Sequence, residues 1–171
     1  RFTYVRDLDN YHRAAYIYDA PNKKLQQVTD GYYTCGISAF DAEGKYLFLT
    51  TDQSFNPYYS DIDNSFIYGN STQLAAISLK KTTPSILYPK NDTVAIKLED
   101  AKKDSSAKKA DSKAVDIDFD GIQQRMVILP VANGNYGLIA AVKGKFIYHK
   151  FPNTGSAPDV RPSLKYFDLD K

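Results

Sequence analysis

Apolar residues are concentrated in two strand-length runs, at residues 35–40 and 45–50, on either side of a short polar turn. The turn is Asp41-Ala42-Glu43-Gly44. Its glycine can adopt the positive φ that a tight reversal needs, because glycine has no Cβ. The pattern therefore predicts a β-hairpin over residues 35–50.

A second copy of this unit lies one hundred positions further along the chain. A run at 138–142 precedes Lys143-Gly144, and a second run follows at 145–148. The segments GKYLF at 44–48 and GKFIY at 144–148 match in chemistry at all five positions. Self-similarity of this kind indicates a repeated supersecondary unit.

Further runs extend the pattern on both sides of the first hairpin. Two runs at 14–19 and 25–29, joined by turn-forming residues, bring the number of strands expected between residues 14 and 50 to four. Four antiparallel strands in about forty residues is the repeat of a β-propeller blade. More strands are expected in the rest of the chain, at 73–79 paired with 85–88, then at 115–119, 125–131 and 163–168. The last of these should lack its outer partner.

Two segments interrupt the strand pattern. Residues 51–70 contain Pro57, which cannot donate to a β-ladder, and are expected to form a long packed loop anchored by the aromatic side chains Phe55, Tyr58, Tyr59 and Phe66. Residues 91–114 lead into a stretch of Lys, Asp, Ser and Ala that cannot bury a core, which predicts a solvated insertion. The fold class expected for residues 1–171 is all-β, an incomplete β-propeller of about three four-stranded antiparallel blades with this low-complexity insertion.

Composition narrows the class of protein. The 171 residues, 43% of them hydrophobic, suit one domain with its own core, and the 14 Tyr and nine Phe favour strands. The net charge of +2 gives no electrostatic reason to expect nucleic acid or an anionic membrane as a partner. No apolar run approaches the roughly 18 residues that span a bilayer. Cys35 is the single cysteine, so no internal disulfide can form, and its apolar neighbours favour a buried, inert thiol.

Candidate chemical motifs are all incomplete. The sequence at 116–121 has the D-x-D-x-D-G opening of a calcium loop, but Val127 stands where the bidentate Glu should be. Ser105 and Lys108 have S-x-x-K spacing inside the low-complexity stretch, where nothing positions a nucleophile. The run at 36–40 fails the G-x-S-x-G pattern at its last residue, and two histidines, His12 and His149, are too few for a zinc site. We expect no catalytic, cofactor-binding or metal-binding residue and no cofactor.

Three segments, taken in order, resemble a known family. DAEGKYLF at 41–48 resembles the D-x-D-G-K signature of the propeller repeats of TolB-like and tricorn-protease-like proteins. FNPYYS at 55–60, with the residues up to 70, is similar to a blade connection in bacterial tricorn protease homologues. Residues 119–122, Arg125, 129–131 and 134–136 look like a later segment of the same propeller region. Ala42 stands where the repeat usually has Pro, a departure that weakens the TolB reading more than the tricorn one.

The resemblance implies a large serine peptidase with two propellers, a PDZ-like domain and a C-terminal catalytic domain. None of the family's catalytic motifs matches a position here, so the chain is expected to be a non-catalytic propeller segment that guides or filters peptides. The alternatives are a stand-alone TolB-like interaction platform and the propeller of a prolyl-oligopeptidase-like enzyme.

The expected partners and location follow from the same resemblance. Both ends of the sequence look cut, which suggests a fragment of a longer chain. The partners expected are the remainder of that chain (missing blades, PDZ-like and peptidase domains), peptides, and a second copy in a possible homo-oligomer. A periplasmic or otherwise exported location in a bacterium is implied, with the cytoplasm as the alternative.

Overall fold

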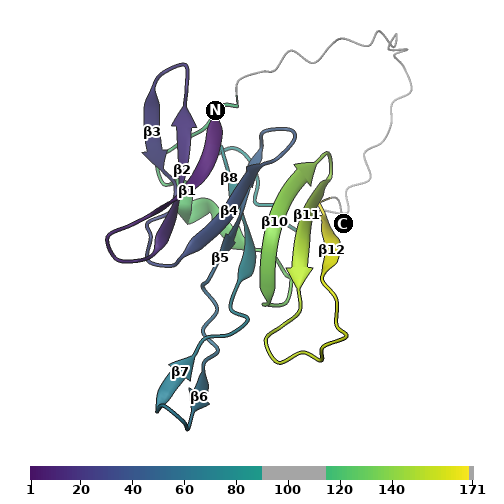
Figure 1. Ribbon diagram of the computed structural model, residues 1–171. Coiled ribbons are helices and arrows are strands. Elements are labelled where there is room, and N and C mark those ends of the chain that lie inside the picture. Colours follow the sequence, from purple (N-terminus) through teal and green to yellow (C-terminus); the bar gives the residue numbers. More distant parts are fainter. Residues whose placement is uncertain (90–114, 170–171) are drawn as a thin grey trace, which may run out of the picture.

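The computed structural model describes residues 1–89 and 115–169, and this part of the chain is built from β-strands and one short 3-10 helix. Three antiparallel sheets are packed face to face in a row, and a small two-stranded hairpin projects from the middle one (Figure 1). No helix in the described part of the chain has the length and apolar character needed to cross a membrane.

Each of the three larger sheets is a meander in which strands follow one another in chain order. The first sheet contains β1 (Phe2–Asp7), β2 (Arg13–Asp19) and β3 (Lys24–Gln27). The central sheet contains β4 (Cys35–Phe40), β5 (Tyr46–Thr51), β8 (Gln73–Ser78) and β9 (Met126–Ile128), the last preceded by the 3-10 helix η1 (Ile122–Arg125). The third sheet contains β10 (Asn135–Val142), β11 (Lys145–Phe151) and β12 (Ser163–Asp168). The small hairpin, called the aromatic hairpin below, is β6 (Tyr58–Ser60) and β7 (Ser65–Ile67).

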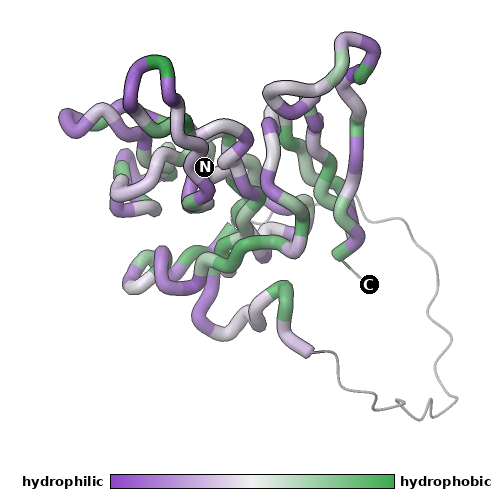
Figure 2. Tube along the Cα trace, turned by 90° about the horizontal axis from the view of Figure 1, so that it is seen from below, coloured by the Kyte–Doolittle hydropathy of each residue, from purple (hydrophilic) through white to green (hydrophobic). Residues whose placement is uncertain are grey.

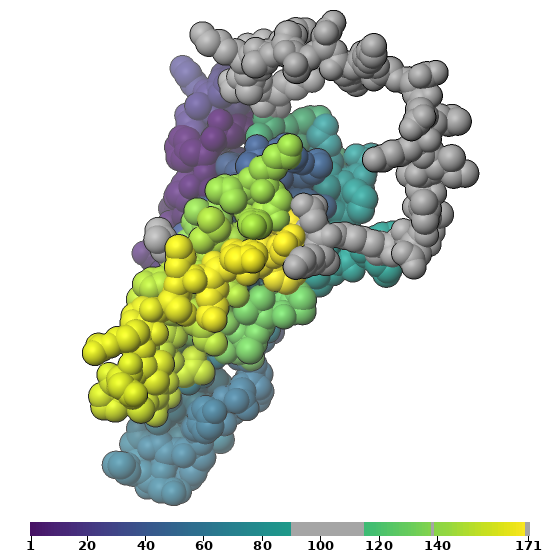
Figure 3. Space-filling model, turned by 90° about the vertical axis from the view of Figure 1, so that its right-hand side faces the viewer, coloured from purple at the N-terminus to yellow at the C-terminus, as the bar shows by residue number. Residues whose placement is uncertain are grey.

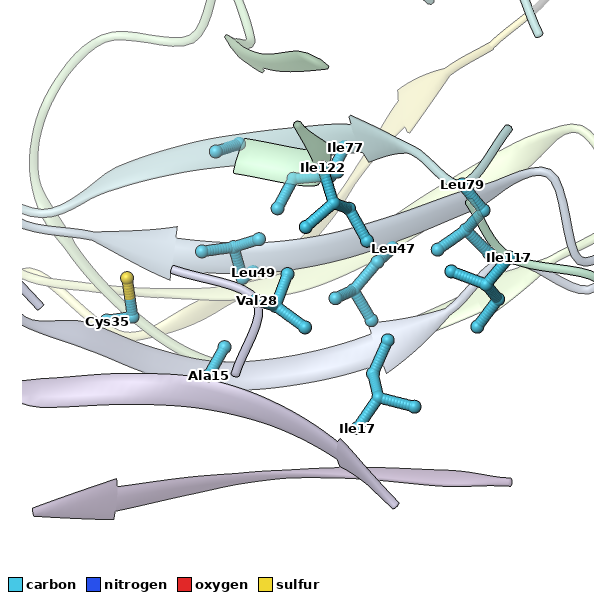
Figure 4. Close-up of a cluster of buried hydrophobic side chains, with 11 residues drawn as sticks. Ala15, Ile17, Val28, Cys35, Leu47, Leu49, Ile77, Leu79, Ile117 and Ile122 are labelled. Atoms are coloured by element: carbon cyan, nitrogen blue, oxygen red, sulfur yellow. The ribbon is translucent and has the colours of Figure 1, made fainter. Parts of the chain in front are cut away.

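The central sheet is buried on both faces. Along β5, Leu47 and Leu49 point toward the first sheet, whereas Phe48 points toward the third and stacks on Phe146 with ring centroids 4.4 Å apart. Successive strand residues point to opposite faces, so a strand between two layers must be apolar at nearly every position. This explains the continuous apolar run of β5. Figure 4 shows the first cluster of buried side chains, and Figure 2 shows how hydrophobic and hydrophilic residues are distributed along the chain trace.

The strand register is the same in all three sheets. One strand in each sheet has the same pattern: a basic residue just before or at its start, then aromatic residues at alternate positions. These strands are β1, β5 and β11. The first aromatic residue of each pairs with the next strand of its sheet, as Phe2↔Tyr18, Tyr46↔Ser78 and Phe146↔Phe167. The sequence at 1–5 is thus a third copy of the unit, which the sequence analysis missed. Among the described residues, the first sheet has no counterpart of β4, and the third sheet has no counterpart of β9.

The structure confirms both expected hairpins but divides the four strands between residues 14 and 50 differently. β2 and β3 belong to the first sheet, and β4 and β5 belong to the central sheet. A four-stranded unit over 14–50 was therefore wrong. The complete four-stranded meander starts at β4 and ends at β9.

Two predicted strands are absent from the described structure. Residues 85–88 do not pair with β8, because they close a turn in which the Tyr88 N–H donates to the Ser85 carbonyl at 2.9 Å. The partner of β8 is instead β9, far along the chain. Residues 115–119 form no strand, although their alternation is real: Ile117 is buried in the first core cluster, and Val115 and Phe119 pack against that cluster.

The segment at 51–70 is also not the packed loop that was expected. It contains the aromatic hairpin, and its proposed anchors are exposed, with Phe55 81% and Phe66 59% accessible. Pro57 lies just before β6, where no ladder bond is required of it. The predicted solvated insertion at 91–114 lies outside the described residues.

Candidate binding groove

A large hollow in the described structure lies where the first and central sheets meet. One part has a volume of about 1050 Å³ and is lined by the end of β3, the 29–33 corner and η1. A second part of about 650 Å³ continues past Tyr33 and Gln53, which line both parts, to His12 and the base of the aromatic hairpin. We call the two together the groove.

A tight corner at Asp30–Gly31 sets one wall of the groove. Asp30 Oδ1 accepts a hydrogen bond from the Tyr32 N–H at 3.0 Å, which closes an Asx turn. Gly31 has φ of +82° and lies so close to Leu8 that an added Cβ would clash with it, so only glycine fits. Asn10 Nδ2 donates to the Gly31 carbonyl at 3.1 Å. The corner is thereby fixed, and Tyr32 and Tyr33 point outward, 76% and 51% exposed.

The opposite wall is η1 and the residues just before it. Gly121, at φ of +63°, turns the chain into the short helix, and Ile122 packs into the first core cluster. This anchor leaves Gln123 and Gln124 on the groove side. Arg125 braces the turn from behind, donating from Nε to the Ser78 carbonyl at 2.8 Å and from Nη1 to the Asp120 carbonyl at 3.0 Å. The wall is therefore built on a fixed backbone.

The floor of the groove is apolar and the rim is polar. Val28, Ile122 and Met126 belong to or pack against the first core cluster and form the floor. Gln53, Gln123 and Gln124 have side-chain amides that make no hydrogen bond within the described part of the chain. An apolar base with a few polar groups above it is typical of ligand-binding clefts.

The charge along the groove is negative. Its ionisable lining residues are Asp30, Asp52, His12 and tyrosines, and no Lys or Arg lines it in the residues that the structure describes. The Nδ1 atom of His12 is buried and has no hydrogen-bond partner among the described residues. Both carboxylates lie close enough to Cys35 to add to the raised pKa of its thiol, whose main cause is burial. Cys35 is thus buried, as the sequence predicted, and its raised pKa disfavours the reactive thiolate.

The remaining sequence motifs have structural roles. In the D-x-D-x-D-G segment, Asp116 pairs with Lys80 at 2.7 Å and Asp120 with Lys81 at 2.6 Å, while Asp118 Oδ2 accepts from the Lys81 backbone N–H. The lysine hydrogen bonds hold the pKa of Asp116 and of Asp120 below the usual range. These carboxylates fasten the segment to the end of β8 instead of converging on one point.

The candidate nucleophile in the failed G-x-S-x-G motif also has a structural partner. Ser38 Oγ lies 2.7 Å from Thr3 Oγ1, a hydrogen bond that joins β4 to β1. His149 packs against the Phe151 ring at 4.4 Å, on a different sheet from Ser38. The serine at 105 and the lysine at 108 lie outside the described residues.

Sequence reasoning did not single out the groove residues. Asp52 falls within the loop expected over 51–70, and no motif marks Asp30, Tyr32 or Tyr33. A signal was nevertheless present, because Lys45 is the one basic residue between 25 and 79, a stretch that holds six Asp and Glu. Only the fold shows that Asp30 and Asp52 both lie near Cys35 and line neighbouring parts of one groove.

The described chain is an all-β protein of antiparallel meander sheets packed face to face, with no α-helix among the described residues. No protein-family model matches it. Two relatives from Streptomyces coelicolor are similar in sequence. "Tricorn protease homolog 1" is 28% identical over 142 residues, which is 77% of this chain and 13% of the relative. "Putative tricorn protease homolog 2" is 26% identical over 167 residues, or 90% of this chain and 14% of the relative.

The fold is that of part of a solved peptidase structure. The crystal structure of the tricorn protease matches with a TM-score of 0.68 and 19% identity, over 98% of this chain and 16% of that one. These comparisons confirm the resemblance drawn from the sequence: the chain is similar to part of two tricorn protease homologues and shares the fold of part of the tricorn protease. It spans about one seventh of the length of the relatives that it matches.

Proposed function

We propose that the chain is a non-catalytic β-propeller segment of a tricorn-like serine peptidase, and that it helps to guide or filter peptides. The observation that carries the proposal is the common strand register of three face-packed meander sheets. On this reading each sheet is a blade, the central one complete, the first without its inner strand and the third without its outer strand. Similarity to the tricorn protease structure over nearly the whole chain supports the same arrangement.

The two outer faces of the stack have the apolar character that a neighbouring blade requires. On the first sheet, Phe2 and Tyr18 lie with ring centroids 5.2 Å apart on the face turned away from the core, and Phe2 is 53% exposed. On the third sheet, Leu164 and Tyr166 are 68% and 59% exposed. Figure 3 looks onto this side of the molecule, with β12 in yellow.

Exposed apolar side chains gathered on one face favour association. Among the described residues, β1 and β12 are also edge strands of their sheets, and edge strands invite pairing with further strands. The partners proposed are therefore further blades of the parent chain and, in their absence, second copies of this chain.

Sedimentation velocity over a wide concentration range tests the proposal. The chain should self-associate reversibly, and Leu164→Glu with Tyr166→Glu should shift it to monomer. Tyr58→Glu with Ile67→Glu is the matched control, because these side chains are also more than half exposed but lie on the aromatic hairpin. A wild-type chain that stays monomeric throughout, or equal effects of the two double variants, would refute a role of the outer face in blade packing.

A further inference from the structure

We propose that the groove between the first and central sheets binds an extended peptide segment that carries Lys or Arg side chains. The inference deepens the peptide-handling part of the proposed function. It rests on residues of the first and central sheets, so it does not require that the outer faces pack against further blades.

The shape of the groove suits a chain better than a compact ligand. Its two parts, of about 1050 and 650 Å³, are neighbours that share Tyr33 and Gln53 as lining residues. Pockets for small molecules are usually about 300–1,000 Å³ in total. The groove runs from η1 past the 29–33 corner to the base of the aromatic hairpin, so its occupant must be elongated.

The groove offers pairing groups for a peptide main chain. A peptide unit has both an N–H donor and a C=O acceptor, and a side-chain amide has both as well. Gln53, Gln123 and Gln124 stand along the rim with no hydrogen-bond partner in the described part of the chain. They can therefore bind a main chain without first giving up bonds within the protein.

The charge of the groove selects basic side chains. Asp30 and Asp52 are its carboxylates, and no described lining residue is a Lys or Arg that could neutralise them. Complementary charge favours the encounter and the correct partner, and like charge is costly. An acidic peptide is thus disfavoured along the same path.

Aromatic walls add a second means of holding a cation. Tyr32 and Tyr33 line the groove at the 29–33 corner. Phe55 and Tyr68 line its second part, and their ring centroids are 5.9 Å apart. Lys and Arg bind favourably over aromatic faces. Because these rings are exposed before binding, covering them with the aliphatic parts of Lys or Arg also removes apolar surface from water.

Fluorescence polarisation with three labelled peptides of equal length tests the proposal. The probes alternate Ala with Lys, with Gln or with Glu. The Lys peptide should bind at least tenfold more tightly than the Glu peptide, with the Gln peptide between them. Asp30→Asn with Asp52→Asn should remove most of the preference for Lys. Asn keeps the side-chain oxygen that closes the turn at Tyr32, so the fold should persist.

Asp61→Asn with Asp159→Asn is the matched control, because it changes the net charge equally at exposed sites outside the groove. It should leave the preference for Lys unchanged. Equal losses in the two double variants would show that general charge attraction is responsible and would overturn the proposal. So would equal binding of the Lys and Glu peptides. If the variant with Asn at 30 and 52 unfolds at a lower temperature than the wild type, Gln53→Ala is used in its place. It should weaken the binding of all three peptides.

The two proposals fail separately. Loss of peptide selectivity with intact self-association through the third sheet would reject the groove and leave the blade-packing proposal standing. Selective peptide binding by a chain that never self-associates would reject the blade-packing proposal and leave the groove proposal standing.

Discussion

At the scale of single residues, the core depends on a few side chains that join the layers. Phe48 and Phe146 are fully buried and stacked, and they connect the central sheet to the third. A large aromatic side chain removed from such a place leaves a cavity that the backbone cannot fill. An equally large ring on the surface contributes little.

Phe48→Ala is therefore expected to lower the free energy of unfolding by about 3–5 kcal/mol. Urea denaturation followed by circular dichroism gives the value. Phe55→Ala, at a residue that is 81% exposed, serves as the control and should change stability by no more than about 0.5 kcal/mol. Similar losses in both variants would mean that the interface between the central and third sheets is not the core described above.

Buried weak acids make the stability sensitive to alkaline pH. Burial raises the pKa of Cys35, Tyr46, Tyr136 and Tyr148 above their ordinary values. An acid whose pKa is raised in the folded state stabilises that state below its unfolded pKa, and this contribution disappears as the pH rises through the folded pKa.

The chain should accordingly lose stability above about pH 8.5, the ordinary pKa of a thiol, and further near the tyrosine range at about pH 10. Thermal melts across this interval measure the effect. In Cys35→Ala the first part of the decline should be smaller. A melting temperature that rises with pH in this interval would contradict the burial of these groups.

At the scale of elements, the sequence predicted hairpins well and long-range pairing poorly. The turns at Gly44 and Gly144 have positive φ of +70° and +74°, as the sequence indicated. A glycine in a polar turn between two strand-length runs predicts a hairpin from a short stretch of sequence alone. The pairing of β8 with β9 is not local, because nearly fifty residues separate the two strands. The exposure of the aromatic hairpin was also missed, since aromatic residues usually indicate a core.

Gly44→Ala tests the first hairpin turn. The substitution forces a side chain into a positive-φ conformation, which costs about 1–2 kcal/mol, and its Cβ would lie 2.9 Å from Val115. Gly155→Ala is a matched control with φ of +86° and no atom within 4 Å of the added Cβ. The variant at 44 should be the less stable of the two by differential scanning calorimetry. Equal melting temperatures would contradict the contact with Val115.

The aromatic hairpin should be dispensable for folding. Its side chains contact one another, as Tyr59 and Phe66 do at 5.5 Å between ring centroids, and not the two core clusters. Replacing residues 57–67 by a short Gly-Ser link should leave the melting temperature within a few degrees of the original. A large loss of stability would show that the hairpin supports the central sheet.

At the scale of the whole molecule, the proposed propeller segment consists of three sheets in one register, and the outer faces of the first and third sheets are uncovered in the described part of the chain. The central sheet is covered on both sides, whereas the first and third sheets are each covered on one. The strand patterns in the sequence indicated about this much sheet. They could not show where one sheet ends and the next begins, because the chain passes from β3 to β4 through a connection no longer than some turns within a sheet.

Hydrogen exchange measured at a concentration where the chain is monomeric tests this arrangement most directly. β5 and β8 are paired on both sides and buried on both faces, so their amides should exchange most slowly. β1 and β12 are edge strands in the described sheets. Their amides that point away from the sheet should therefore exchange much faster than their amides that face β2 and β11. If all amides of β1 and β12 were as slow as those of β5 and β8 in the monomer, the sheets would form a closed structure, and the account of an open propeller segment would be wrong.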